Sequence, residues 1–197
     1  MTAVIETREA FEAALTERRL LHDVVVRDVD LTGASLSGVL LRAVRFFRSN
    51  LAGIDARGVQ LQNVVFAGCV MRGANFSGAR LVSGSLRVRP HRDQVTDLSE
   101  ADLTDADLES AVFERVLLTR ANLSGAMLDS AELADCDLDD AVLASASLHF
   151  AVVRGCRLRR AQFTRARLDM AAVFDCDGTA ADFTDASLVD ANLSGTS

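Results

Sequence analysis

A large apolar residue recurs at every fifth position through most of this chain, and this period constrains the fold more than any other feature. One series runs from Val26 to Leu86, and a second runs from Leu98 to Leu193. An α-helix turns about 100° per residue, so a five-residue period would scatter these side chains around its surface. A long β-strand would send alternate ones to opposite faces. The period therefore excludes both elements as the organising unit.

A small apolar residue lies two positions before most of these centres, as in Ala101-Asp102-Leu103. The other positions of the repeat are mostly Asp, Asn, Ser, Thr, Arg or Gly, residues that favour tight turns. We expect a short extended stretch with two inward side chains, followed by a turn. Each repeat then forms one side of a coil, and successive coils stack through backbone hydrogen bonds.

Charged residues spaced by 20 indicate how many repeats complete one coil. Two such series alternate in sign. Their members are Glu100, Arg120, Asp140 and Arg160 in the first, and Asp137, Arg157 and Asp177 in the second. If four repeats make one coil, these side chains lie above one another about 4.8 Å apart. Opposite charges at that separation stabilise the stack, whereas like charges would repel. The series therefore predict two charge ladders.

The repeat resembles that of the pentapeptide repeat family. Motifs such as Ala74-Asn75-Phe76-Ser77-Gly78 and Ala121-Asn122-Leu123-Ser124-Gly125 carry the resemblance, which covers roughly residues 24–195. The resemblance implies an all-β fold, a right-handed quadrilateral β-helix with four repeats per coil. The two series of centres then correspond to about eight coils.

Interruptions of the period predict the organisation of one continuous solenoid domain. Residues 1–22 form an N-terminal helix and cap, and residues 23–86 form the first β-helix block. A register-breaking basic loop spans 87–97, and a second, acidic block spans 98–195. Thr7 can cap the helix.

The predicted helix runs from Thr7 to about Arg19, with Phe11, Ala14 and Leu15 on one side. A short capping helix of this kind would cover the open backbone edge of the first coil. A helix that binds a partner is the alternative.

The loop at 87–97 is the first candidate contact site. It contains Arg87, Arg89, His91 and Arg92. A tolerated surface insertion explains it equally well. A few basic residues without aromatic neighbours are a weak signal for nucleic acid, so we expect no direct nucleic-acid binding.

A second candidate patch lies in the acidic block. Phe150 and Met170 occupy outward positions 20 residues apart, beside His149, and should be neighbours. Phe174, in an irregular stretch, should also point outward. Adjacent exposed apolar side chains are typical of a contact surface.

The net charge of −7 is distributed unevenly. Residues 98–197 carry a net −10 and residues 20–97 a net +4. An acidic surface attracts basic partners, although it also serves solubility. No apolar run approaches the roughly 20 residues of a membrane helix, and a signal peptide is not evident. We expect a cytoplasmic protein with reduced thiols and no membrane contact.

The sequence gives little support for catalysis. Cys69, Cys136, Cys156 and Cys176 lack CxxC spacing and occupy the small inward position, which is typical of core residues rather than zinc ligands. The three His do not form part of a Ser-His-Asp arrangement, and phosphate-binding glycine motifs are missing. We expect a non-catalytic protein with no catalytic residues, no metal and no cofactor.

The family resemblance implies two kinds of function, both based on binding another protein. Members protect type II topoisomerase (gyrase) from quinolones or toxins, through an acidic rod that mimics DNA. Others are scaffolds or accessory and effector modules of bacterial secretion systems. The repeats run to Leu193 without a cap, which predicts end-to-end pairing of two copies or a larger parent protein.

Overall fold

In the computed structural model, which describes residues 3–16, 19–81 and 86–197, every fifth residue from Glu100 to Gly195 has a positive φ. These residues turn the chain at the corners of each coil. Gly, Asp, Asn and Ser tolerate this left-handed conformation, which explains their frequency at the position. At three of the four corners the turn is closed by a backbone hydrogen bond, as from Ala106 N to Leu103 O at 3.1 Å.

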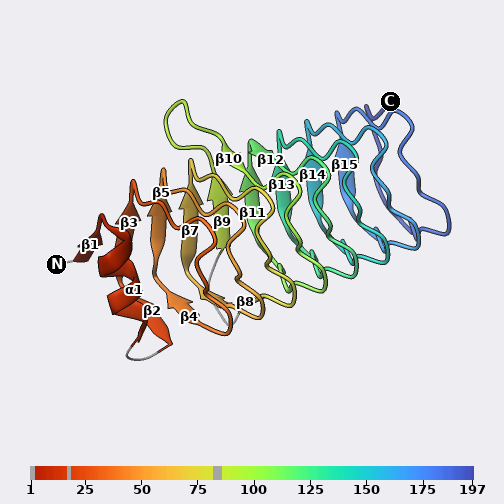
Figure 1. The fold of residues 1–197 in the computed structure, drawn as a ribbon. Helices are drawn as coiled ribbons and strands as arrows, with labels where there is room; N and C mark the ends of the chain where they lie inside the picture. Colours follow the sequence, from red (N-terminus) through yellow and green to blue (C-terminus); the bar gives the residue numbers. More distant parts are fainter. Residues whose placement is uncertain (1–2, 17–18, 82–85) are drawn as a thin grey trace.

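Backbone hydrogen bonds join each coil to the next. The N–H of Leu103 donates to the carbonyl of Asn122 at 2.7 Å, and the N–H of Asn122 donates to the carbonyl of Ala101 at 2.9 Å. The same exchange repeats on every side of the coils. Four five-residue repeats per coil, as expected from the spacing of 20, place each residue above its equivalent. The result is a rod of about eight coils, with the termini at opposite ends (Figure 1).

Three parallel sheets follow the rod, and the remaining sides pair through isolated bridges. The nine-stranded sheet contains β1 (Ala3–Ile5), β3 (Val24–Arg27), β5 (Arg45–Phe47), β7 (Val64–Ala67), β9 (Leu86–Arg89), β11 (Val112–Glu114), β13 (Glu132–Ala134), β14 (Val152–Arg154) and β15 (Ala172–Phe174). The four-stranded sheet contains β2 (Leu20–His22), β4 (Leu40–Arg42), β6 (Gln60–Gln62) and β8 (Arg80–Leu81). The two-stranded sheet contains β10 (Thr96–Asp97) and β12 (Val116–Leu117).

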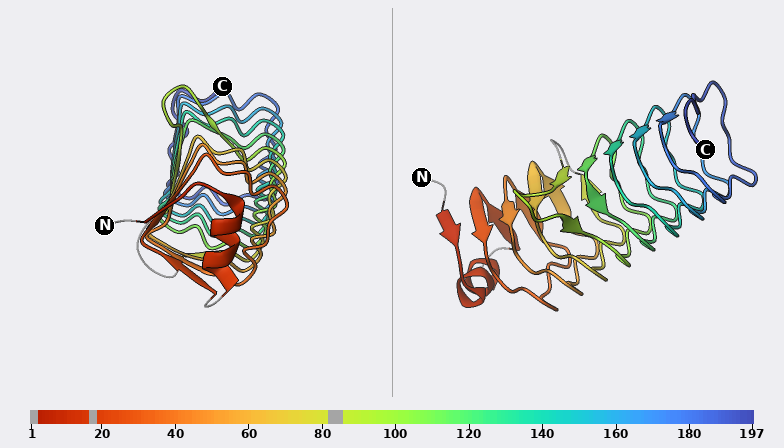
Figure 2. Two further views of the ribbon diagram at one scale, coloured as in Figure 1. Left: turned by 60° about the vertical axis from the view of Figure 1, so that its left-hand side comes forward. Right: turned by 90° about the horizontal axis from the view of Figure 1, so that it is seen from above.

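We number the four sides of the tube in chain order, by the inward residues of one coil. Face 1 is the nine-stranded sheet and contains Phe113, face 2 contains Leu118, face 3 contains Leu123, and face 4 contains Leu128. All four side chains are buried. Viewed nearly along the rod, the coils superpose as a four-sided tube (Figure 2).

A strand and a helix close the N-terminal end. β1 pairs in parallel with β3, and α1 (Arg8–Thr16) then crosses the end of the tube (Figure 2). Thr7 caps α1, because its Oγ1 accepts from Ala10 N at 3.2 Å. Phe11 is completely buried, and its ring lies 6.3 Å from that of Phe46. The helix therefore extends the core beyond the first full coil.

The cap differs in detail from the sequence prediction. The helix ends at Thr16 rather than near Arg19, and Ala14 is exposed instead of facing the core. Leu21 is buried, but it belongs to β2, which pairs with β4. The periodic pattern of a single helix could not reveal that both of its flanks are strands of the first coil.

The register break also differs from the prediction. Asn75 pairs with Asp102, so this coil has 27 residues instead of 20. Val88 is the central inward residue of face 1, because it pairs with Phe66, whereas Leu86 pairs with Val64. Two extra residues therefore precede Val88 and five follow it. Strand β9 stays in the sheet, and among the residues that the structure describes, 90–95 leave the coil.

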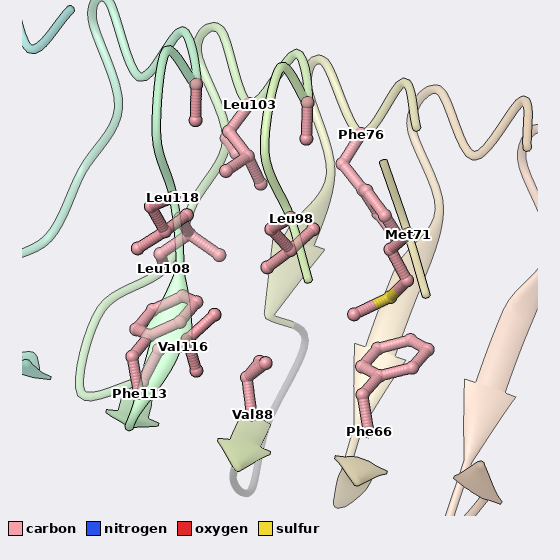
Figure 3. Close-up of a cluster of buried hydrophobic side chains, with 14 of the residues drawn as sticks. Phe66, Met71, Phe76, Val88, Leu98, Leu103, Leu108, Phe113, Val116 and Leu118 are labelled. Atoms are coloured by element: carbon pink, nitrogen blue, oxygen red, sulfur yellow. The ribbon is translucent and has the colours of Figure 1, made fainter. Parts of the chain in front are cut away.

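Buried hydrophobic side chains from several repeats point into the interior around this coil (Figure 3). Val88 lies between Phe66 and Phe113 on face 1, and it is smaller than both. An apolar cavity of about 20 Å³ remains beside these three residues. A cavity of that size without polar lining stays dry.

The four thiols lie in one column at the corner between faces 1 and 2. Here side chains replace the closing turn hydrogen bond. Cys156 Sγ accepts from Cys136 N at 3.4 Å and donates to Arg154 O at 3.4 Å. Ser49 makes the same two kinds of bond with its hydroxyl group. Burial raises the pKa of Cys69 to about 11, so this thiol stays protonated at neutral pH.

We expect Cys156→Ala to lower the free energy of unfolding by about 1–2 kcal/mol, because it leaves a buried N–H without an acceptor. Cys156→Ser should be more stable than the alanine variant, since a hydroxyl group can make both bonds. Urea denaturation followed by circular dichroism measures the difference. Equal stability of the two variants would contradict the hydrogen-bonding role of this column.

Candidate functional site

The first charge ladder lies at the corner between faces 2 and 3. Arg120 donates from Nη2 to Glu100 Oε1 at 2.5 Å. Arg160 binds both carboxylate oxygens of Asp140 at 2.7 Å. Arg72, one coil earlier, also donates to Glu100, at 2.8 Å. The structure thus brings the four predicted residues together as two ion pairs and adds Arg72 to the ladder.

These ion pairs lower the carboxylate pKa values. Hydrogen bonds from Arg72 and Arg120 lower the pKa of Glu100, and Arg160 lowers that of Asp140. Both carboxylates are therefore ionised well below neutral pH. The pairs are solvent-exposed, so each stabilises the fold only slightly.

The second ladder has a diagonal geometry. Arg157 Nη2 lies 3.1 Å from Asp137 Oδ2 and 2.6 Å from Asp139 Oδ2. Asp177 instead binds Arg159, whose Nε lies 2.5 Å from Oδ2. The Thr179 hydroxyl group and Arg159 lower the pKa of Asp177 to about 2. The predicted column is thus a network in which each arginine reaches a carboxylate 18 or 20 residues before or after it.

The basic loop is held against the rod by hydrogen bonds and by one ring contact. His91 and Gln94 exchange two backbone hydrogen bonds, which form a tight turn with Arg92 at its tip. Thr96 is fully buried, and its Oγ1 accepts from Gly68 N at 2.9 Å. The His91 ring lies 5.2 Å from the ring of Phe47. The loop is therefore an ordered feature of the surface.

The predicted loop residues point to different places. Arg87 and Arg89 are exposed on β9, in the sheet of face 1. His91 and Arg92 belong to the turn and line a shallow hollow with Arg48. Arg87 and Arg89 thus belong to a sheet, whereas His91 and Arg92 belong to a turn.

A hydrophobic corner, consisting of Phe150 and Met170, lies between faces 4 and 1. Phe150 is 53% exposed and Met170 is 47% exposed. Both have positive φ values, of 58° and 57°, a conformation that costs a bulky residue roughly 1–2 kcal/mol. The ring of His149 lies 4.2 Å from that of Phe150. Strained and exposed apolar residues are typical of binding sites.

Phe174 does not join this corner. It lies in β15 at the opposite edge of face 1, and it is only half-exposed. Two residues absent from the sequence prediction extend the apolar surface of face 4 instead. Val189 is 63% exposed and Met127 is 46% exposed. Their positions could have been read from the 20-residue columns that they share with His149 and Ser147.

The acidic side chains of the second block are sorted between faces. On face 2 they are largely paired with arginines, as described above. Faces 3 and 4 have an excess of carboxylates over the single arginine of each face. On face 4 the acids are Asp107, Glu109, Asp129, Asp169 and Asp190. On face 3 they are Asp102, Asp105, Asp182 and Asp185. Among the described residues, only Asp169 of these has an arginine within 4 Å.

Within the described ranges, no group of three or more His, Cys, Asp or Glu is arranged to hold a metal ion. The same part of the chain includes no helix of the length and hydropathy required to span a membrane.

We expect Gly68→Ala to destabilise the protein more than Gly73→Ala. Both positions have positive φ, which costs alanine about 1 kcal/mol. At Gly68 a new Cβ would also lie 2.9 Å from Cβ of His91, whereas the space at Gly73 is open. Trypsin cleavage after Arg92 measures release of the loop. Equal cleavage rates for the two variants would show that Gly68 does not position the loop.

We expect Arg157→Glu to lower the melting temperature by roughly 2–4 °C, because it sets a third carboxylate beside Asp137 and Asp139. High salt should reduce the difference by screening. Arg165→Glu, which makes the same charge change away from any described ion pair, should have little effect. Equal melting temperatures for both variants would argue against the network.

Comparisons with known proteins agree with this geometry. The sequence matches the model of the pentapeptide repeats family, in eight copies. The matched residues are 27–63, 49–87, 96–133, 121–160 and 143–177. No curated protein matches the chain significantly.

Similar solved structures are also pentapeptide repeat or resistance proteins. HetL, involved in heterocyst differentiation regulation in the cyanobacterium Nostoc, is 26% identical over 95% of this chain and 94% of its own, with a TM-score of 0.45. QnrB1, a plasmid-mediated fluoroquinolone resistance protein, was solved in two trypsin-treated forms. Both are 18% identical, over 100% and 99% of this chain and 91% and 89% of theirs, with TM-scores of 0.56 and 0.57. The period, the four-sided coil and the matched repeats together establish that this chain belongs to the pentapeptide repeat family.

Proposed function

We propose that this protein is a non-catalytic binder that presents faces 3 and 4 of its second block to a DNA-binding surface of another protein. The partner we propose is a type II topoisomerase, gyrase. The observation that supports this proposal is the excess of carboxylates on these two faces. A row of fixed negative charges on a narrow rod resembles the phosphates of a duplex to a basic groove.

Several of these carboxylates are held in place before any partner binds. Asp129 accepts from Ser147 Oγ at 2.5 Å and from His149 N at 2.9 Å. Asp102 accepts from Thr104 N at 3.0 Å. The donors to these groups are hydroxyl and amide groups, and not arginines. A pre-organised array loses less entropy on binding than a flexible one.

The hydrophobic corner would add contact area at the edge of this acidic surface. Phe150 and Met170 lie at the border of face 4, next to Asp129 and Asp169 on that face. Buried aromatic anchors inside a polar rim are the usual energetic centre of an interface. This corner also supports the alternative proposal, a scaffold that binds its partner through apolar contacts without mimicry of DNA.

The fold is compatible with the first proposal. QnrB1, which has the same fold at 18% identity, is a fluoroquinolone resistance protein. Similarity at this identity concerns the fold alone, so the functional proposal rests on the acidic faces of this chain.

We expect the protein to alter gyrase supercoiling in the micromolar range, with and without a quinolone. Asp107→Asn with Glu109→Gln should weaken the effect, because it removes two carboxylates from face 4. Glu114→Gln with Asp135→Asn makes the same charge change on face 1 and serves as the control. Agarose gels of relaxed plasmid measure supercoiling.

No effect of the wild-type protein on supercoiling would refute the topoisomerase proposal. An effect that both double variants weaken equally would refute the assignment to face 4. If Phe150→Ser abolished the effect while both charge variants retained it, apolar scaffolding would replace DNA mimicry.

A further inference from the structure

The basic residues of the first block form a surface that the proposed function does not use. Five exposed arginines on faces 4 and 1 make up what we call the arginine edge. They are Arg42, Arg45, Arg80, Arg87 and Arg89. These residues lie on β4, β5, β8 and β9, around the corner where face 4 meets face 1.

The strand register places two of these arginines, Arg45 and Arg87, in one column along the sheet. Arg45 pairs with Val65, which pairs with Arg87, so one uncharged strand separates the two arginines. They are therefore about 9.6 Å apart, at two strand spacings. On face 4, Arg80 pairs with Gln60 and Arg42 pairs with Gln62, so these two arginines lie in different columns of the sheet. Strands β4 to β9 contain no Asp or Glu, so the edge is uniformly positive.

Other arginines of the first block have carboxylate partners. Arg48 binds Asp28, Arg57 binds Asp55 at 2.8 Å, and Arg72 binds Glu100 at 2.8 Å. Within the described ranges, none of the five arginines of the edge forms an ion pair. Their guanidinium groups are thus available to an external anion.

Acidic residues mark both ends of the edge. Asp23 occupies the same corner one coil before it. After it, faces 4 and 1 carry Asp107, Glu109 and Glu114. The edge is therefore a bounded site three coils long, about 10 Å between its outer strands.

We propose that the arginine edge binds an acidic peptide segment of a partner protein. The planar guanidinium group matches a carboxylate with two parallel hydrogen bonds, and it sheds water more easily than an ammonium group. In a polyproline II peptide, side chains three residues apart share one face and lie about 9.3 Å apart, which matches the spacing of Arg45 and Arg87. Val65, between them, offers an apolar contact to the intervening residues.

A peptide fits this surface better than duplex DNA does. A duplex along the rod would pass from the edge onto Asp107, Glu109 and Glu114, which would repel its phosphates. The aromatic ring nearest to the edge, Phe47, is packed against His91 and is not free to stack on a base.

This inference is independent of the topoisomerase proposal, because it concerns a different surface and a ligand of opposite charge. The arginine edge and the acidic faces 3 and 4 would give the two halves of the rod binding surfaces of opposite charge. A partner with both a basic groove and an acidic segment would bind in one orientation only.

The test is fluorescence anisotropy of a labelled peptide with Glu at every third position and Ser between, at about 50 mM salt. A net charge of −7 would make a uniformly charged protein repel this peptide, so binding itself reports a local basic site. We expect wild-type binding, about tenfold weaker binding by Arg45→Glu with Arg87→Glu, and loss of binding in high salt. Arg165→Glu with Arg167→Glu reverses the same two charges on faces 3 and 4 and should bind like wild type.

Circular dichroism melting of each variant checks that the coil is intact, and Arg45→Gln with Arg87→Gln provides a milder change if the glutamate variant unfolds. No binding by the wild-type protein, or equal binding by both charge-reversed variants, would overturn the proposal. Tighter binding of a duplex oligonucleotide, abolished by the same two substitutions, would assign the edge to nucleic acid instead. Association of the wild-type protein with itself at low salt, lost in the same variant, would assign it to the acidic coils of a second copy.

Discussion

Backbone hydrogen bonding between consecutive coils is the constraint on which the rest of this structure depends. Each side of a coil exchanges hydrogen bonds with its neighbours in both directions, since Leu103 N donates to Asn122 O and Asn122 N donates to Ala101 O. These bonds exist only if equivalent residues stay in register, so every coil needs the same number of sides. The five-residue repeat meets this need with a short extended stretch and one left-handed corner residue. The corner between faces 1 and 2 adds thiol and hydroxyl groups to complete the hydrogen bonding.

This constraint also explains where the chain can vary. Inward positions must be apolar and of matched volume, since neighbouring coils pack directly against one another. The 27-residue coil retains its sheet pairing because β9 still pairs with β7 and β11, while residues 90–95 lie outside the tube. Variation in charge and function is thereby restricted to outward positions and to residues 90–95. Even bulky corner residues such as Phe150 are accommodated, although their backbone conformation is unfavourable.

Charges on the four faces have different roles. On face 2 the carboxylates and arginines neutralise one another in ladders, which leaves little field for a partner. Faces 3 and 4 of the second block keep an excess of negative charge, and faces 4 and 1 of the first block keep an excess of positive charge. Net charge per segment, which the composition gives, hides this sorting. The faces that carry unpaired charges therefore indicate binding surfaces better than the net charge of either block does.

From the sequence alone, the five-residue period excluded a helix and a long strand and located most inward residues, and the spacing of 20 indicated four sides per coil. It also placed the residues of the ladders in common columns, since the spacing of 20 is purely arithmetic. Only the tertiary structure showed that Arg157 binds Asp139 while Arg159 binds Asp177, because side-chain reach, and not register, selects among nearby carboxylates. It alone placed Val88 at the centre of face 1, because only the pairing of Val88 with Phe66 shows how many of the extra residues of this coil precede it. Strand β1 could not be predicted from its three residues, because its pairing partner β3 lies about 20 residues away in the sequence.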